Sequence, residues 1–178
     1  PMLSSESFRQ NRGLGNEVPF YAFDYAPEAE LQVREHVNFL VENLAKDKSG
    51  YRMARVNLFA IIIEMLDERG FYEKSVTTQT KKGNDALLKQ LKGTLDAEIV
   101  AKYIAKRWSP NEHDAYLIDG VGSAYPLIRT HSLLNALQPL FGLKPLVLFF
   151  PGEYDGQSLS LFGQLVDTPY YRAFRLVD

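Results

Sequence analysis

Three aspartates stand where an open parallel sheet usually binds its ligands. Asp24, Asp119 and Asp155 lie in the loops that follow three predicted strands. Because the carboxyl ends of parallel strands meet at one edge of a sheet, these carboxylates could be neighbours. Two or three carboxylates together could hold a magnesium ion. The alternative, which we favour, is that each aspartate caps a helix or shapes a turn.

A glycine-containing loop is the second candidate for chemistry. Gly120, Gly122 and Ser123 precede a predicted helix, and helix N-termini bind phosphate. A dinucleotide-binding fingerprint would need a third glycine at position 125, but this residue is Tyr125, whose bulk would hold helix and strand apart. The chain also has no P-loop lysine motif. A tight turn is therefore the favoured interpretation of this loop.

Hydrolase chemistry has little support. Ser123 does not stand in a Gly-x-Ser-x-Gly motif, although His131 on the following helix could serve as its base. Cysteine is absent, and the three histidines are far apart in the sequence, so a thiolate or histidine-rich metal site is not expected. We therefore predict a protein that is not an enzyme and that carries no cofactor.

Aromatic and basic residues gather in the last third of the chain. Tyrosine and arginine are both favoured at protein interfaces. The candidate partner-binding residues are Tyr154, Tyr170, Tyr171, Arg172 and Arg175. These residue types are equally at home on a half-buried edge strand, and that alternative stays open.

A run of lysines is the remaining functional candidate. Between residues 74 and 92 there are five lysines and one acid, Asp85, which gives a local charge of +4. The lysines are Lys74, Lys81, Lys82, Lys89 and Lys92. Such a run could contact the phosphates of DNA, although most lysine runs are simply solvated surfaces and few aromatic residues accompany this one.

The elements that must position these residues follow an alternating order. Proline and acidic residues after the first strand predict a helix from Pro27 to about Lys46, and Gly70 ends a second helix. Residues 73–83 are polar and without periodicity, which predicts a loop. Pro126 is expected to open a helix, and the run Leu146–Phe150, apolar at every position, indicates a strand buried on both faces. We expect Pro151-Gly152 to end that strand.

Alternating strands and helices predict an α/β fold. The 178 residues suit a single α/β domain over 1–178, a mostly parallel sheet flanked by helices, with a helical insertion around 72–108. The net charge is −2, which excludes a strongly basic nucleic-acid-binding protein. No apolar run is long enough to span a membrane, and a cytoplasmic location is expected.

Four sequence segments together resemble the BrxB family of BREX bacteriophage-exclusion operons. They cover most of the chain, from about residue 11 to 177, and the resemblance is weakest over 72–112. The segments are NRGLGNEVPF (11–20), GVGSAYPLIRTH (120–131), FFPGEYDGQSL (149–159) and YYRAFRL (170–176).

The resemblance implies a role rather than a reaction. BREX systems defend bacteria against phage, and the BrxB family looks like an accessory component that has no agreed catalytic motif. The leading hypothesis is thus a non-enzymatic adaptor in an anti-phage complex, which binds other BREX components, with the phosphatase-like PglZ as the expected partner. The alternatives are a nucleotide- or metal-dependent enzyme that uses the candidate loops, and a DNA-contacting subunit that uses the lysines.

Overall fold

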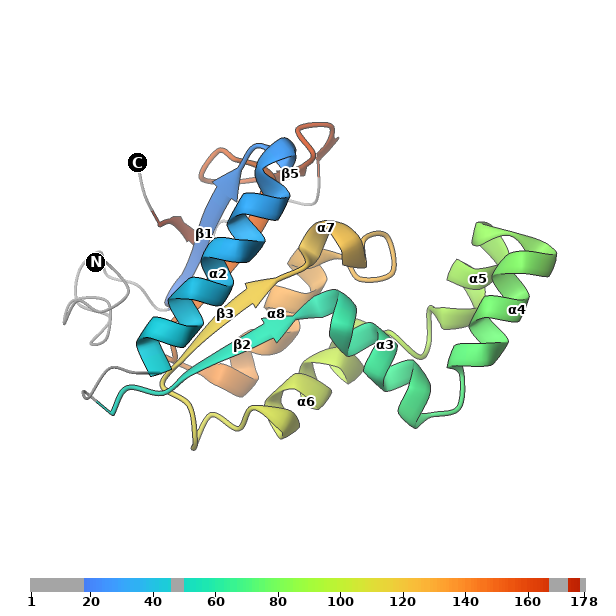
Figure 1. Cartoon of the computed structure of the whole chain (residues 1–178), viewed down its shortest axis with the longest axis horizontal. Helices are drawn as coiled ribbons and strands as arrows, with labels where there is room; N and C mark the ends of the chain where they lie inside the picture. The colour runs from blue at the N-terminus through green and yellow to red at the C-terminus, as the bar shows by residue number, and fades with distance from the viewer. Residues whose placement is uncertain (1–17, 46–49, 167–172, 177–178) are drawn as a thin grey trace.

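The computed structural model describes residues 18–45, 50–166 and 173–176. Strands and helices alternate through most of this length (Figure 1). The strands are β1 (Phe20–Tyr25), β2 (Met53–Asn57), β3 (Ala115–Asp119), β4 (Leu146–Tyr154), β5 (Leu159–Leu161), β6 (Leu165–Val166) and β7 (Ala173–Arg175). The helices are η2 (Pro27–Ala29), α2 (Glu30–Ala45), α3 (Leu58–Glu68), α4 (Tyr72–Lys82), α5 (Asn84–Leu91), α6 (Ala97–Arg107), α7 (Val121–Ala124) and α8 (Thr130–Phe141).

The main sheet is parallel, which confirms the predicted fold class. Its strand order is β2-β3-β4-β1-β7, and each neighbouring pair runs in the same direction. β4 lies between β3 and β1, so the run Leu146–Phe150 is central and buried on both faces, as predicted. β5 and β6 extend the end of β4 as an antiparallel hairpin.

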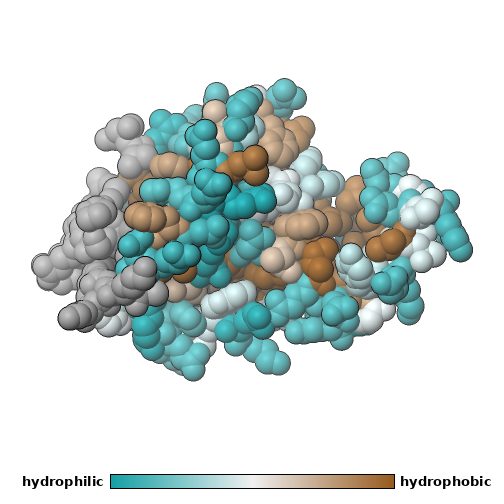
Figure 2. Space-filling view, in the orientation of Figure 1, coloured by the Kyte–Doolittle hydropathy of each residue, from teal (hydrophilic) through white to brown (hydrophobic). Residues whose placement is uncertain are grey.

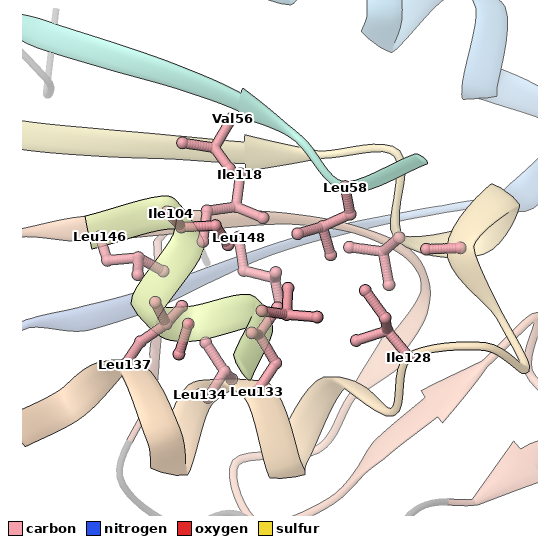
Figure 3. Packing of buried hydrophobic residues seen from close by; sticks show 14 of the residues in the cluster. Val56, Leu58, Ile104, Ile118, Ile128, Leu133, Leu134, Leu137, Leu146 and Leu148 are labelled. Atoms are coloured by element: carbon pink, nitrogen blue, oxygen red, sulfur yellow. The ribbon is translucent and has the colours of Figure 1, made fainter. Parts of the chain in front are cut away.

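Each face of the sheet has its own hydrophobic core. Val37 of α2 packs with Leu117 and Val147 on one face. On the other face, side chains of β2, β3 and β4 point toward α6 and α8, where Figure 3 shows Ile104, Leu134 and Leu137. Successive residues of a strand point to opposite faces of the sheet, so neighbouring residues of one strand contribute to different cores.

The predicted insertion around residues 72–108 is helical, as expected, but one segment of it was predicted wrongly. Residues 73–83, expected to be a loop, lie almost entirely within helix α4. Only Ser75 of this helix is buried, so α4 lacks the apolar stripe by which sequence analysis finds helices. α4 instead pairs with α5, where Thr78 donates to Gln90 at 2.6 Å, and the pair projects from the body of the molecule (Figure 1).

Two further boundaries differ from expectation. α8 begins at Thr130 and not at Pro126, because residues 125–127 form a turn and Arg129 is then extended, with φ −93° and ψ 127°. β4 runs through Pro151-Gly152 to Tyr154, because at this point it pairs with β5. A Cβ atom at Gly152 would lie 2.1 Å from the Ser160 carbonyl oxygen, so the close approach of the two strands requires glycine.

No helix among the described residues is both long enough and apolar enough to cross a lipid bilayer.

Candidate functional site

A cluster of polar side chains occupies the carboxyl edge of the sheet, on the face covered by α2. Its centre is Asp119, at the end of β3 and only 5% exposed. Arg55 of β2 donates to Asp119 Oδ2 from Nε at 3.1 Å and from Nη2 at 2.5 Å, and it also donates to Asn38 of α2. Asp119 Oδ1 is buried and hydrogen-bonds to no atom of the described residues. The ion pair therefore satisfies only half of this carboxylate.

Tyr25 belongs to the same cluster. Its hydroxyl donates to Glu30 Oε2 at 2.5 Å. Burial raises the pKa of Tyr25 far above its usual range, and the Glu30 carboxylate and the charge of Asp119 act in the same direction. Tyr25 therefore stays protonated at neutral pH and acts as a hydrogen-bond donor rather than as a base.

Asp24 lies on the opposite face of the sheet. It accepts a hydrogen bond from the backbone N–H of Tyr154 at 3.0 Å and one from Arg175 Nη2 at 2.8 Å. Because Asp24 pairs in register with Phe150 and Ile118 pairs with Leu148, the side chains of Asp24 and Asp119 point away from each other across the sheet.

Asp155 is held in an exposed turn. Its Oδ1 accepts from the backbone N–H of Gln157 at 2.7 Å and from that of Ser158 at 2.6 Å. These backbone hydrogen bonds lower the pKa of Asp155. The possibility that Asp24, Asp119 and Asp155 share a magnesium ion is thus not supported, because each serves a different local contact, and the described residues contain no metal-binding group of acids and histidines.

The candidate phosphate loop is closely packed. Gly120 adopts φ +74°, and a Cβ atom there would meet the Asn57 side chain at 2.9 Å. A Cβ atom at Gly122 would lie 3.0 Å from Phe162 and from Pro151. Ser123 is exposed on the four-residue helix α7, whereas His131 Nε2 hydrogen-bonds with Ser132 at 3.1 Å. Both glycines therefore have a packing role, and only Gly120 has the left-handed backbone conformation of a turn, since Gly122 lies within α7.

The structure describes two of the five predicted partner-binding residues, Tyr154 and Arg175. Tyr154 is 1% exposed, and its hydroxyl donates to the Ala173 carbonyl oxygen at 2.7 Å, so it is a core residue and we withdraw it as a surface candidate. Arg175 is exposed, but it also donates to the Tyr154 carbonyl oxygen at 2.6 Å and links strands. Tyr170, Tyr171 and Arg172 lie outside the described residues.

All five lysines of the basic run are exposed on α4, on α5 or directly after α5. Within the described part of the chain, none of them forms an ion pair. The projecting pair thus presents positive charge on a protein whose net charge is −2.

An apolar surface that was not predicted from the sequence lies between α3 and α4. Phe59 is 42% exposed, Tyr72 38% and Val76 44%, and Tyr72 lines a shallow groove together with Ile63. We call these four residues the α3–α4 surface. Figure 2 shows hydrophobic atoms where the body meets the projecting pair. The signal was present in α3, which carries apolar residues beyond the stripe that faces the core.

Comparison with known proteins gives consistent matches. A family model described as "BREX protein BrxB" matches residues 54–176. The chain is 43% identical to a BREX protein BrxB of Bacillus cereus, over 100% of this chain and 93% of that protein. It is also 43% identical to a BREX protein BrxB of Escherichia coli, over 98% of this chain and 86% of that protein. The search of solved structures found no significant match.

Proposed function

Since the chain belongs to the BrxB family, we propose that it is a non-enzymatic accessory component of a BREX anti-phage system, which acts by binding another protein of that system. The observation that carries this proposal is the α3–α4 surface. Large apolar side chains in a contiguous exposed patch are typical of interaction sites, whereas singly scattered ones are not.

The arrangement of the α3–α4 surface suits a protein partner. Phe59 and Ile63 are one helical turn apart on α3, and Tyr72 and Val76 have the same spacing on α4. Glu64 and Asp67 line the groove beside Tyr72, and Glu64 forms an ion pair with Arg107 at 2.8 Å. An apolar centre with an acidic rim fits a partner that offers apolar side chains flanked by basic ones.

The aspartates support a non-catalytic role for the carboxyl edge. Asp24 joins strands, Asp155 closes a turn, and Asp119 pairs with Arg55.

Co-purification tests the proposal, with PglZ as the first partner. The chain would be co-expressed with PglZ of the same operon and sized at moderate salt, as wild type and with Phe59→Glu or Tyr72→Glu. We expect a stoichiometric complex that either substitution abolishes. Leu31→Glu on α2 is the matched control, because Leu31 is 70% exposed and lies away from the α3–α4 surface.

Two results would contradict the proposal. If neither PglZ nor another BREX component co-purifies with the wild-type chain, the adaptor role is wrong. If a complex forms and the substitutions at Phe59 and Tyr72 leave it intact, the α3–α4 surface is not the contact.

A second candidate function is DNA contact by the projecting α4–α5 pair, favoured by its exposed lysines without ion pairs. Lysines that neutralise phosphates release counterions, so the affinity would fall steeply as salt increases. Fluorescence anisotropy with duplex DNA over a salt series, for wild type and for Lys81→Gln with Lys82→Gln, measures this. Absent binding, or binding independent of salt, would reject DNA contact.

A further inference from the structure

Two helical ridges build the α3–α4 surface and its borders, each with about one residue per turn. The residues are Phe59, Ile63 and Asp67 on α3, and Tyr72, Val76 and Thr80 on α4. All six are exposed or half-buried, whereas Leu58 and Ile62 of α3 point into the core. Rows of residues four apart are the ridges that pack into the grooves of another helix. The surface therefore has the spacing that a further helix needs for packing.

The backbone of α3 and of the turn that follows it leaves few groups for a partner strand. Within α3 the N–H and C=O groups bond to each other. In the turn, the Gly70 N–H donates to the Asp67 carbonyl oxygen at 2.9 Å. The Phe71 N–H likewise donates to the Leu66 carbonyl oxygen at 2.7 Å.

The conformation of a partner segment follows from its own backbone. An extended segment laid on apolar side chains loses the water that solvates its N–H and C=O groups, and here α3 and the turn do not replace those hydrogen bonds. A helix keeps its backbone hydrogen bonds within itself, so it covers such a surface without that loss. Phe59 and Asp67 lie about 12 Å apart along α3, which two to three turns of a partner helix would span.

Acidic side chains give the partner helix its charge. Glu64 and Asp67 line the groove beside Tyr72, and no basic residue is among its described lining residues. Glu64 is already paired with Arg107 at 2.8 Å. Asp67 is exposed and forms no ion pair with any described residue. A lysine or arginine of the partner would therefore find Asp67 available for pairing.

We propose that the segment that occupies the α3–α4 surface is a basic amphipathic helix of the partner protein. Its apolar residues recur three or four positions apart, and one lysine or arginine beside them faces Asp67. This inference rests on the proposed adaptor function and adds the conformation and the charge of the partner segment.

Hydrogen exchange of the complex with PglZ, the first partner of the co-purification test, locates the segment. Comparison of PglZ alone, with the wild-type chain and with Phe59→Glu identifies the PglZ segment whose protection depends on the α3–α4 surface. That segment, as a synthetic peptide, is then the probe for the full chain. We expect circular dichroism to show a gain of helix on binding. A central proline at a solvent-facing position of the peptide should weaken binding by about 100-fold, and alanine at the same position should not.

Charge reversal tests the pairing of Asp67. Asp67→Lys should weaken binding of the peptide by roughly tenfold at low salt and by less at high salt. Glutamate in place of the facing basic residue of the peptide should restore binding to this variant. Glu112→Lys is the matched control, because Glu112 is exposed and does not line the groove, and its affinity should equal that of the wild type.

The outcomes separate this inference from the function on which it rests. If no complex forms, or if Phe59→Glu leaves the complex intact, both fail. If the complex depends on Phe59 but the central proline is tolerated, or Asp67→Lys binds the peptide like the wild type, only this inference is wrong. It is also wrong if the partner protects the edge strand β2 in place of α3 and α4, since the partner then adds a strand to the sheet. A dimer of the chain alone that Phe59→Glu dissociates would assign the surface to a second copy and overturn the inference as well.

Discussion

The guanidinium of Arg175 lies 2.8 Å from the carboxylate of Asp24 and joins the last described strand of the chain to the first. The same guanidinium donates to the Tyr154 carbonyl oxygen, and the Tyr154 N–H donates to Asp24. Three neighbouring strands of the sheet, β4, β1 and β7, are thus linked through one ion pair.

We predict that Arg175→Met lowers the free energy of unfolding by about 1–2 kcal/mol, because it leaves Asp24, 15% exposed, without its cation. Urea denaturation measures the change. In the double variant with Asp24→Asn, the two losses should be less than additive. The control is Arg34→Met, which removes an exposed pair within one helix and should cost only about 0.3–0.5 kcal/mol. Equal losses at the two arginines would contradict the linking role of Arg175.

Arg55 should be more important for stability than Arg175. Its partner Asp119 has a side chain only 7% exposed, so Arg55→Met leaves a buried carboxylate without a cation. We expect a loss of about 3 kcal/mol in chemical denaturation. Adding Asp119→Asn removes the buried charge and should restore part of that loss. If the double variant is less stable than Arg55→Met alone, the account of this pair is wrong.

The Asp114 carboxylate should make stability depend on pH. Burial opposes the shift, but the hydrogen bonds and charge of Arg52, with Lys144, lower its pKa below 3.8. Because the folded pKa is depressed, the stabilisation is present above the unfolded pKa and disappears as pH falls through the folded pKa. Asp114→Asn should therefore cost about 1 kcal/mol at neutral pH and almost nothing in acid. Urea denaturation of the wild type and of Asp114→Asn at neutral and at acidic pH measures this. A difference in stability between the two proteins that is the same at both pH values would contradict the prediction.

Gly152 tests the close approach of β4 and β5. Gly152→Ala would place a methyl group 2.1 Å from the Ser160 carbonyl oxygen, so we expect a loss of about 3 kcal/mol in the free energy of unfolding. Gly93→Ala is the control, because a Cβ atom at Gly93 meets nothing within 4 Å. Its effect should stay below about 1 kcal/mol in either direction. Similar thermal melting of both variants would refute the steric argument.

Much of the fold could be predicted from local sequence. The uninterrupted apolar run Leu146–Phe150 indicated a central strand, because burial on both faces leaves a direct trace in residue type. α4 was missed, because it buries a single residue and depends on pairing with α5, which no local pattern reports.

The α3–α4 surface could not be predicted for a related reason. Tyr72 and Ile63 line one groove although they belong to different helices. Such neighbours are brought together only by the packing of elements. The type of each residue alone does not show whether it faces the core or solvent.

The sequence by itself determined the fold class and the family, since both depend on the order of elements and on strings of residues along the chain. Only the tertiary structure decided what the aspartates do. Asp24 and Asp119 both end parallel strands, yet the register of β1, β3 and β4 places their side chains on opposite faces of the sheet. Side chains alternate with a period of two, so a difference of one residue in where a strand ends converts a candidate metal site into two separate ion pairs.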